Sequence, residues 1–212
     1  MPEGLKVWLA PFHSVGHRRA SALLKDLGAT VIAAEAPPED ALIVVTPFGE
    51  DTASVVGAHQ LDGERTVALD TFFGLEQGRR RVLMCSVATQ EKWRDAAHAL
   101  FASDGTPVTV INDSAGFVGQ RMLASIVNVA CDIAQQAIAT PEDIDRAVSL
   151  GLAYPKGGPL SMGDSLGAAH VLEILRAMQH VTGDMRYRPS PWLQRRVQLG
   201  MSLQAQAACS AS

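Results

Sequence analysis

The chain has 212 residues, of which 47% are hydrophobic and 19% are charged, and its net charge is −4. This composition is typical of a globular protein of one or two domains, and the negative charge argues against nucleic-acid binding, which relies on clustered cations. The first residues lack a signal-peptide pattern, and no apolar run is long enough to span a bilayer. We therefore expect a cytoplasmic protein that binds neither nucleic acid nor membrane.

The first 112 residues alternate short apolar strands with helices. Strands are predicted at Lys6–Ala10, Thr30–Ala34, Ala41–Val45, Thr66–Leu69, Val82–Met84 and Val108–Ile111, and helices at Arg18–Leu27 and Glu91–Phe101. This alternation predicts a parallel sheet with helices packed against it. The fold class expected for residues 1–112 is a truncated, Rossmann-like α/β domain.

A dinucleotide-binding domain begins with a strand, a helix and a second strand that ends in an acid. It also needs G-x-G-x-x-G after the first strand, because the glycines let the backbone approach the pyrophosphate. Here the loop at residues 11–18 has only one glycine. Pro11 has no backbone N–H to donate to a phosphate, and the side chains of Phe12 and His13 are bulky. Glu35, at the tip of the second strand, could still hold a ribose hydroxyl. The sequence favours a sheet kept for its shape over competent NAD binding.

The segment from Gly116 to Ile138 is predicted to be one long helix. Its polar residues recur every three or four positions and fall on one face: Arg121, Ser125, Asn128, Asp132 and Gln135. The rest of the circumference is nearly all apolar, which predicts a central helix of an all-α unit, packed on several sides. Gln120 shares a face with apolar residues, so it is either a packed structural amide or a group aimed into a cleft.

Three further helices are expected in this unit. In the first, Thr140 is the N-cap, Pro141 the first helical residue and Asp143 the capping-box acid. Its inner face is formed by Ile144, Ala147 and Val148, and Gly151 ends it. The next helix carries His170 and His180, with Val171, Leu172, Leu175 and Met178 inward. The last helix is capped by Ser190, starts at Pro191 and ends at Gly200.

An ordered set of short motifs runs through the same region. They are formed by Asp113, Gly116, Phe117, Gln120 and Arg121, then Ala139, Asp143, Ile144, Asp145, Ala147 and Gly151, then Pro155, Gly158 and Pro159, and finally Asp164 and Gly167. Their order and spacing resemble the C-terminal domain of L-3-hydroxyacyl-CoA dehydrogenases. The resemblance implies a helical domain like the C-terminal domain of 6-phosphogluconate dehydrogenase at residues 113–200. Residues 201–212 lack the family's usual ending and are expected to be a frayed tail.

The resemblance also assigns catalytic positions. The family's catalytic histidine corresponds to Thr71, the glutamate that orients it to Leu83, and its active-site asparagine to Gln120. Threonine cannot serve as the general base near neutral pH, and losing such a base typically costs about 10²–10⁴-fold in rate. Leucine cannot orient a base, and glutamine displaces the amide by a methylene. The three positions therefore predict that this chain alone is inactive.

The other reactive side chains do not suggest a replacement site. His13 and His17 flank the degenerate loop and could contact an anion or lie in solvent, His59 is assigned to a polar connection, and His98 to a packing or surface position. The cysteines Cys85, Cys131 and Cys209 form neither a disulfide framework nor a metal pattern, and Cys131 is expected in the core. The run Arg79–Arg81 is interpreted as a solvated turn.

The resemblance implies part of an NAD-dependent 3-hydroxyacyl-CoA dehydrogenase of fatty-acid metabolism. The chain looks like the second half of a longer bacterial member, acting mainly as a structural module that forms a homodimer through its helical domain. NAD and acyl-CoA are the ligands of the family, and NAD is expected not to bind this chain alone. Two alternatives stay open: an active NAD-dependent dehydrogenase with altered pocket residues, and an acyl-CoA-binding module without redox activity.

Overall fold

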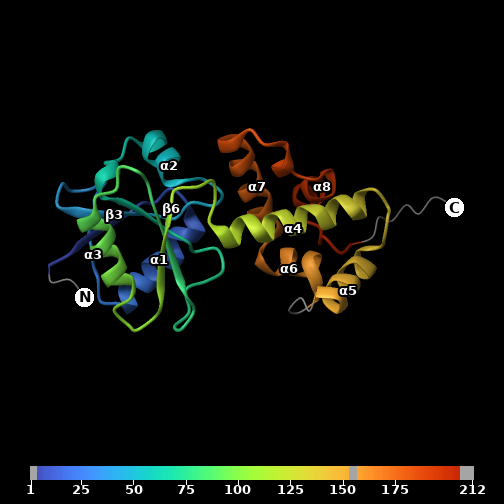
Figure 1. Ribbon diagram of the computed structural model, residues 1–212, viewed down its shortest axis with the longest axis horizontal. Coiled ribbons are helices and arrows are strands. Elements are labelled where there is room, and N and C mark those ends of the chain that lie inside the picture. The colour runs from blue at the N-terminus through green and yellow to red at the C-terminus, as the bar shows by residue number, and fades with distance from the viewer. Residues whose placement is uncertain (1–3, 153–156, 206–212) are drawn as a thin grey trace. The chain divides into compact units, whose positions relative to one another are not determined.

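The computed structural model describes residues 4–152 and 157–205 and divides the chain into two compact units, Met1–Phe117 and Val118–Ser212. The division falls after Phe117 and not after residue 112, because the connecting residues belong to the first unit. Asp113 accepts hydrogen bonds from Thr52 and Ala53 there, and Phe117 is buried in its core. Unit 1 contains a sheet with helices, and unit 2 is helical (Figure 1).

Unit 1 is an α/β unit with a six-stranded sheet. Its elements are β1 (Lys6–Leu9), α1 (Ser14–Asp26), β2 (Thr30–Val31), β3 (Ala41–Val45), α2 (Thr52–His59), the 3₁₀ helix η1 (Gly63–Arg65), β4 (Thr66–Leu69), β5 (Arg81–Cys85), α3 (Glu91–Phe101) and β6 (Val108–Asn112). The strand order is β2-β1-β3-β4-β5-β6. The Rossmann-like fold class is confirmed, in the form of a mostly parallel sheet.

The sheet is mixed, because β5 runs antiparallel to β4 while all the other neighbours are parallel. The fully parallel sheet expected from the sequence is therefore wrong at this pair. A parallel strand requires a crossover of a dozen or more residues, usually a helix, whereas β4 and β5 are joined without one. Once β5 is reversed, a right-handed crossover to β6 places α3 on the same face of the sheet as α1.

Alternating strand residues build one core on each face of the sheet. Leu42 and Val44 point toward α1 and α3, and Ile43 points with Val55 of α2 toward the other face. The two layers of helices are visible in Figure 1. Helix α2 was missed in the sequence because its apolar residues lack a helical period, although Asp51 caps it by accepting a hydrogen bond from the amide of Ser54 at 2.6 Å.

Two further expectations in unit 1 are corrected. The interpretation of Arg79–Arg81 as a solvated turn fails at Arg81, which begins β5 and is 2% exposed. Its guanidinium donates to the carbonyl of Phe101 and to both carboxylate oxygens of Asp104, at 2.7 and 2.9 Å. His59 is not in a polar connection but is the last residue of α2.

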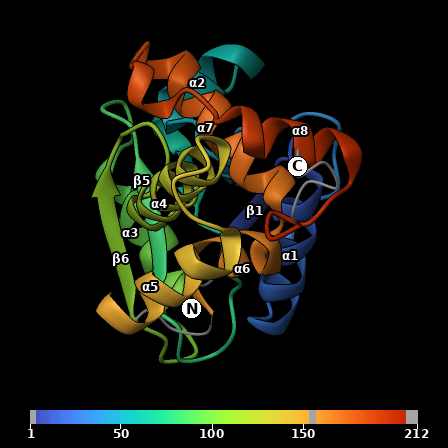
Figure 2. The same cartoon turned by 90° about the vertical axis from the view of Figure 1, so that its right-hand side faces the viewer.

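Unit 2 contains only helices among its described residues. They are α4 (Val118–Gln135), α5 (Pro141–Leu152), α6 (Gly158–Leu166), α7 (Ala168–Thr182), the 3₁₀ helix η2 (Met185–Tyr187) and α8 (Pro191–Leu199). Figure 2 shows α4 nearly end-on, with α5, α6, α7 and α8 around it, and α4 contacts each of these four helices. The expectation of a central helix in an all-α unit is confirmed.

The exposed residues of α4 nevertheless differ in part from those predicted. Asn128, assigned to an outer polar face, is 4% exposed, whereas Met122 and Val129 are 61% and 59% exposed. Asn128 is buried because its amide holds the chain leading into α8: it donates to the carbonyl of Arg188 at 2.9 Å and accepts from the amide of Ser190 at 2.8 Å.

The predicted caps of unit 2 are confirmed. The hydroxyl of Thr140 accepts from the amide of Asp143, that of Ser190 accepts from the amide of Trp192, and Gly200 adopts the left-handed conformation after α8. The inner face assigned to α5 is corrected at Ala147, which is exposed, and the helix continues through Gly151 to Leu152.

The segment after α8 is partly fixed. Leu203 is fully buried, and its amide donates to the carboxylate of Asp164. The expectation of a frayed tail is therefore wrong for residues 201–205, and the rest of that tail, with Cys209, lies outside the described residues. Within the described part of the chain, none of the helices combines the length and the apolarity that crossing a membrane requires.

Candidate functional site

The strand order of unit 1 creates a topological switch point. From β1 the chain moves outward through α1 to β2, and it then returns to the other side of β1 to form β3. In open α/β sheets, ligands bind outside the carboxyl ends of the two strands at which the order reverses. Here those ends are followed by the loop from Ala10 to His13 and by the segment from Thr46 to Glu50.

In the first of these loops, the side chain of His13 caps the helix that follows. Helix α1 begins at Ser14, earlier than the sequence indicated, because His13 is its N-cap: the ring Nδ1 accepts from the amide of Gly16 at 2.9 Å. A Cβ atom on Gly16 would lie 2.4 Å from the hydroxyl of Thr46, so the start of α1 packs directly against the end of β3. The glycine therefore serves helix-to-strand packing.

Aromatic rings bridge the two sides of the switch point. The His13 ring lies 3.9 Å from that of Phe48, and Phe12 stacks on His59, the last residue of α2, at 3.5 Å and 4°. Phe48 in turn meets Phe72 edge to face at 5.5 Å. Aromatic pairs of this kind stabilise the fold by more than the burial of their apolar area alone. Sequence reasoning noted the bulk of Phe12 and His13 but had no signal for their ring partners.

The other predicted site residues of unit 1 are not brought together. Glu35 lies beyond the two-residue strand β2 and is exposed. Leu83 is a fully buried member of the core beneath α1 and α3. Thr71 is fully buried, and its hydroxyl has no hydrogen-bond partner among the described residues. Its carbonyl accepts from Arg19 at 2.7 Å, which ties the loop after β4 to α1.

In unit 2 the motif residues Asp145 and Gly158 hold helices together. Asp145 is 4% exposed and caps α6, accepting from the amides of Leu160 and Ser161 at 2.8 and 2.9 Å. Its carboxylate also accepts from the side chains of Ser161 and Gln204. Gly158 has a φ of +86°, and a Cβ atom there would lie 2.5 Å from the Cα of Asp145. Asp145 is therefore needed here as a hydrogen-bond acceptor, and Gly158 is needed for the close approach of α6 to α5.

A second motif carboxylate, Asp164, fixes the segment Ser202–Ala205, which we call the C-terminal strap. Asp164 accepts from the amide of Leu203 at 2.9 Å and from the hydroxyl of Ser202 at 2.6 Å. The leucine side chain lies against Gly163, where a Cβ atom would approach it to 2.8 Å. Gln120, which the resemblance matched to the family's active-site asparagine, is fully buried near the start of α4.

The described cysteines are not reactive thiols. Burial raises the pKa of Cys85 to about 11 and that of Cys131 to about 12. A thiolate is the reactive form, so neither residue is activated near neutral pH. Cys131 is fully buried on α4, as the sequence predicted, and His98 lies on the exposed side of α3.

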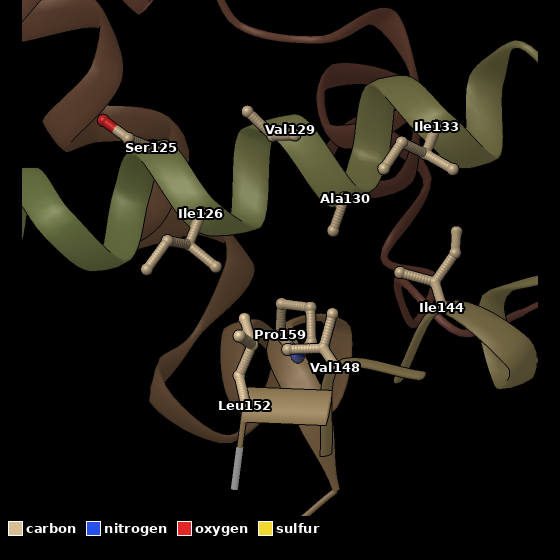
Figure 3. Close-up of a pocket in the computed structure, with 9 residues that line it drawn as sticks. All are labelled: Ser125, Ile126, Val129, Ala130, Ile133, Ile144, Val148, Leu152 and Pro159. Carbon is tan, nitrogen blue, oxygen red and sulfur yellow. The ribbon is translucent and has the colours of Figure 1, made fainter. Parts of the chain in front are cut away.

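An apolar groove runs along one side of α4. It has a volume of about 280 Å³, and its lining contains no charged residue: Ser125, Ile126, Val129, Ala130, Ile133, Ile144, Val148, Leu152 and Pro159. Figure 3 shows Ile126 and Ala130 directed toward Val148 and Pro159 across the groove. Sequence reasoning did not predict this groove. Of the polar residues assigned to one face of the helix, only Ser125 lines it.

The same combination of a sheet unit and a helical unit occurs in known proteins. A crystal structure of (S)-3-hydroxybutyryl-CoA dehydrogenase from Ralstonia eutropha shares the fold over 92% of this chain and 65% of its own, with a TM-score of 0.70 and 22% identity. Both units thus share the fold of that crystal structure. In addition, residues 116–208 match the family model of the 3-hydroxyacyl-CoA dehydrogenase C-terminal domain. This match agrees with the resemblance that the motifs indicated.

Curated relatives agree over the same part. A probable 3-hydroxybutyryl-CoA dehydrogenase of Bacillus subtilis is 34% identical over 114 residues, which are 54% of this chain and 39% of that protein. The 3-hydroxyadipyl-CoA dehydrogenase of Escherichia coli K12 is 41% identical over 95 residues, which are 45% of this chain and 20% of that protein. The matched part thus spans well under half the length of each relative.

Proposed function

We propose that this chain serves a 3-hydroxyacyl-CoA dehydrogenase as a structural and dimerisation module and does not catalyse the reaction alone. The proposal includes a cytoplasmic location and a homodimer formed through unit 2. It rests on one observation above the others: the switch point of unit 1 is bridged by the ring contacts of Phe12 with His59 and of His13 with Phe48.

The residues present do not fit a bound dinucleotide. A pyrophosphate needs free amides at the start of α1 and a glycine-lined approach. The amide of Gly16 is already satisfied by His13, and the loop before it carries an aromatic ring that stacks on α2. Glu35 is exposed beyond a strand of two residues. NAD, the cofactor that the family implies, is therefore excluded from the proposed role.

The chain also lacks the side chains that the reaction of the family requires. Removing the proton of a 3-hydroxyl requires a base, and the corresponding position holds the hydroxyl of Thr71, which has no described partner that could accept its proton. Leu83 is fixed in the core and offers no polar atom to orient one. Both observations support a role without catalysis, whereas the packed motif residues and the apolar groove of unit 2 support an assembly role.

A binding and turnover experiment tests this proposal. The full chain is titrated with NADH by fluorescence, and NADH oxidation is followed with acetoacetyl-CoA, with the Bacillus subtilis relative as the positive control. We expect neither saturable binding nor turnover from this chain. Saturable NADH binding with turnover would overturn the proposal in favour of an active enzyme with altered residues. Protection of the fold by the CoA ester alone would instead favour a non-redox acyl-CoA-binding module.

A further inference from the structure

A second pocket of unit 2 lies at the carboxyl end of α4 and shares no lining residue with the apolar groove. It has a volume of about 460 Å³, which falls within the roughly 300–1,000 Å³ of small-molecule sites. Its walls are the last turn of α4, the connection to α5, the first turn of α5 and the side chain of Trp192 on α8. The pocket is therefore formed within unit 2 alone.

The charge of this pocket is negative. Asp143 lines it and is exposed, and none of the described residues in the lining carries a positive charge. One carboxylate oxygen of Asp143, Oδ2, accepts from the hydroxyl of Thr140 at 2.7 Å, and the other accepts no hydrogen bond among the described residues. Glu142, the preceding residue of α5, is also exposed. The pocket therefore offers a free carboxylate oxygen to a cationic ligand.

The end of α4 adds to the negative potential. Ala134 and Ala137 bring this end of the helix to the pocket, and the backbone carbonyls of Gln135 and Gln136 accept no hydrogen bond among the described residues. The carboxyl end of a helix carries about half a negative elementary charge, which favours a cation nearby. The positive end of α5 does not cancel this effect, because acidic side chains already occupy its first turn.

The remaining wall is apolar and suits the uncharged part of a ligand. Ile138 is 68% exposed and Trp192 is partly buried, and both line the pocket. The guanidinium of Arg196 lies over the indole ring of Trp192, 3.0 Å from the ring centroid. Because this ring already contacts one cation, we expect it to contact an alkyl chain and not a second positive charge. The positive end of a ligand is therefore expected at Asp143.

We propose that this pocket binds a small primary alkylamine. Its ammonium group is held by the free oxygen of Asp143 and the carboxyl end of α4, and its alkyl chain lies against Ile138 and Trp192. An ammonium group has three N–H donors and no acceptor, which matches a wall that presents oxygen acceptors. A lysine side chain carries the same chemistry, and the test separates the two sources. The inference goes beyond the proposed structural role and does not depend on it.

A ligand titration is the first arm of the test. Butylamine is added to the full chain, and the backbone amides of residues 137–143 and the indole N–H of Trp192 are followed by NMR. We expect saturable shifts at these positions. 1-Butanol and butyrate, which lack the positive charge, should bind about tenfold more weakly or less, because a hydrogen bond to a charged group is lost. Shifts that do not saturate, or equal binding of 1-butanol, would overturn the proposal.

The same titration with Nα-acetyl-lysine amide identifies the source of the amine. Tighter binding of butylamine supports a free alkylamine as the ligand. Tighter binding of the lysine derivative would overturn the free amine and assign a lysine side chain of a protein to the pocket.

Substitutions are the second arm. Asp143→Asn removes the charge but keeps an oxygen that can accept from Thr140, and it should weaken butylamine binding about tenfold or more. Glu142→Gln, which alters the neighbouring exposed acid outside the lining, is the matched control and should bind nearly as the parent does. Ile138→Asn should remove the preference for butylamine over methylamine. Equal affinities of the parent and Asp143→Asn, or equal losses in the two acid variants, would contradict the site.

The two arms are independent of folding defects and of the proposed function. Circular dichroism reports whether each variant folds, and the comparison of butylamine with 1-butanol decides the question in the parent chain alone. Neither arm involves NADH, so the absence of amine binding would leave the proposed structural role untouched.

Discussion

Replacing Asp145 by alanine tests whether the motif residues of unit 2 are structural. The carboxylate is 4% exposed and accepts from two backbone amides and two side chains at 2.6–2.9 Å. Losing a helix cap costs about 0.5–2 kcal/mol, and leaving a buried donor such as the amide of Leu160 unsatisfied costs about 1–3 kcal/mol. We expect Asp145→Ala to lower the unfolding free energy of unit 2 by about 3 kcal/mol.

Two variants of the same region calibrate this value. Asp145→Asn keeps one acceptor oxygen and should lose about half as much. Asp143→Ala removes an exposed capping-box carboxylate on the same helix and should cost about 1 kcal/mol or less. Urea unfolding gives the free energies, and hydrogen exchange of the amides of Leu160 and Ser161 locates the loss at the start of α6. Equal costs for Asp145→Ala and Asp143→Ala, with exchange unchanged there, would refute the reasoning.

Three further predictions concern stability. The hydrogen bonds from Arg81 hold the pKa of the Asp104 carboxyl well below its usual range, so the associated stability is present above the unfolded value of about 3.9 and is lost as the pH falls through the folded pKa. Asp104→Asn should therefore lower the melting temperature at pH 7 and flatten its fall below pH 4, and parallel melting curves for both proteins would contradict this. Ala137 adopts a φ of +54° after α4, so Ala137→Gly should stabilise unit 2 by about 0.5–1 kcal/mol in urea, whereas a loss would argue against strain there. Gly163→Ala should cost about 1–3 kcal/mol because its Cβ meets the C-terminal strap, while Gly57→Ala, with open space on α2, should stabilise, and equal effects would exclude crowding as the cause.

The sequence predicted well the features that local chemistry determines. Thr140 with Asp143, and Ser190 with Gly200, define helix ends through hydrogen bonds within a few residues, so their roles could be inferred without a fold. The order of short motifs identified the helical domain. The strand Ala41–Val45 was predicted at its observed bounds, because a short, fully apolar run beside turn residues is a strong strand signal.

Features that depend on distant residues could not be predicted in the same way. The reversal of β5 was indicated in the sequence only by the lack of a predicted helix between the strands at residues 66–69 and 82–84, and the alternation of strands and helices elsewhere outweighed that signal. Asn128 looked like a surface residue until its two partners, sixty residues later in the chain, were in place. On the same helix, Met122 and Val129 are exposed, although the sequence counted them among the packed apolar residues. His59 gave no sign of its stacking on Phe12.

The most direct test of the central claim is NADH oxidation by the full chain in the presence of acetoacetyl-CoA. With the switch point of unit 1 bridged by its own aromatic side chains and Thr71 in place of a base, we predict a rate indistinguishable from that of the buffer. Turnover that saturates with both NADH and acetoacetyl-CoA, and disappears when Thr71 is replaced by valine, would contradict the account.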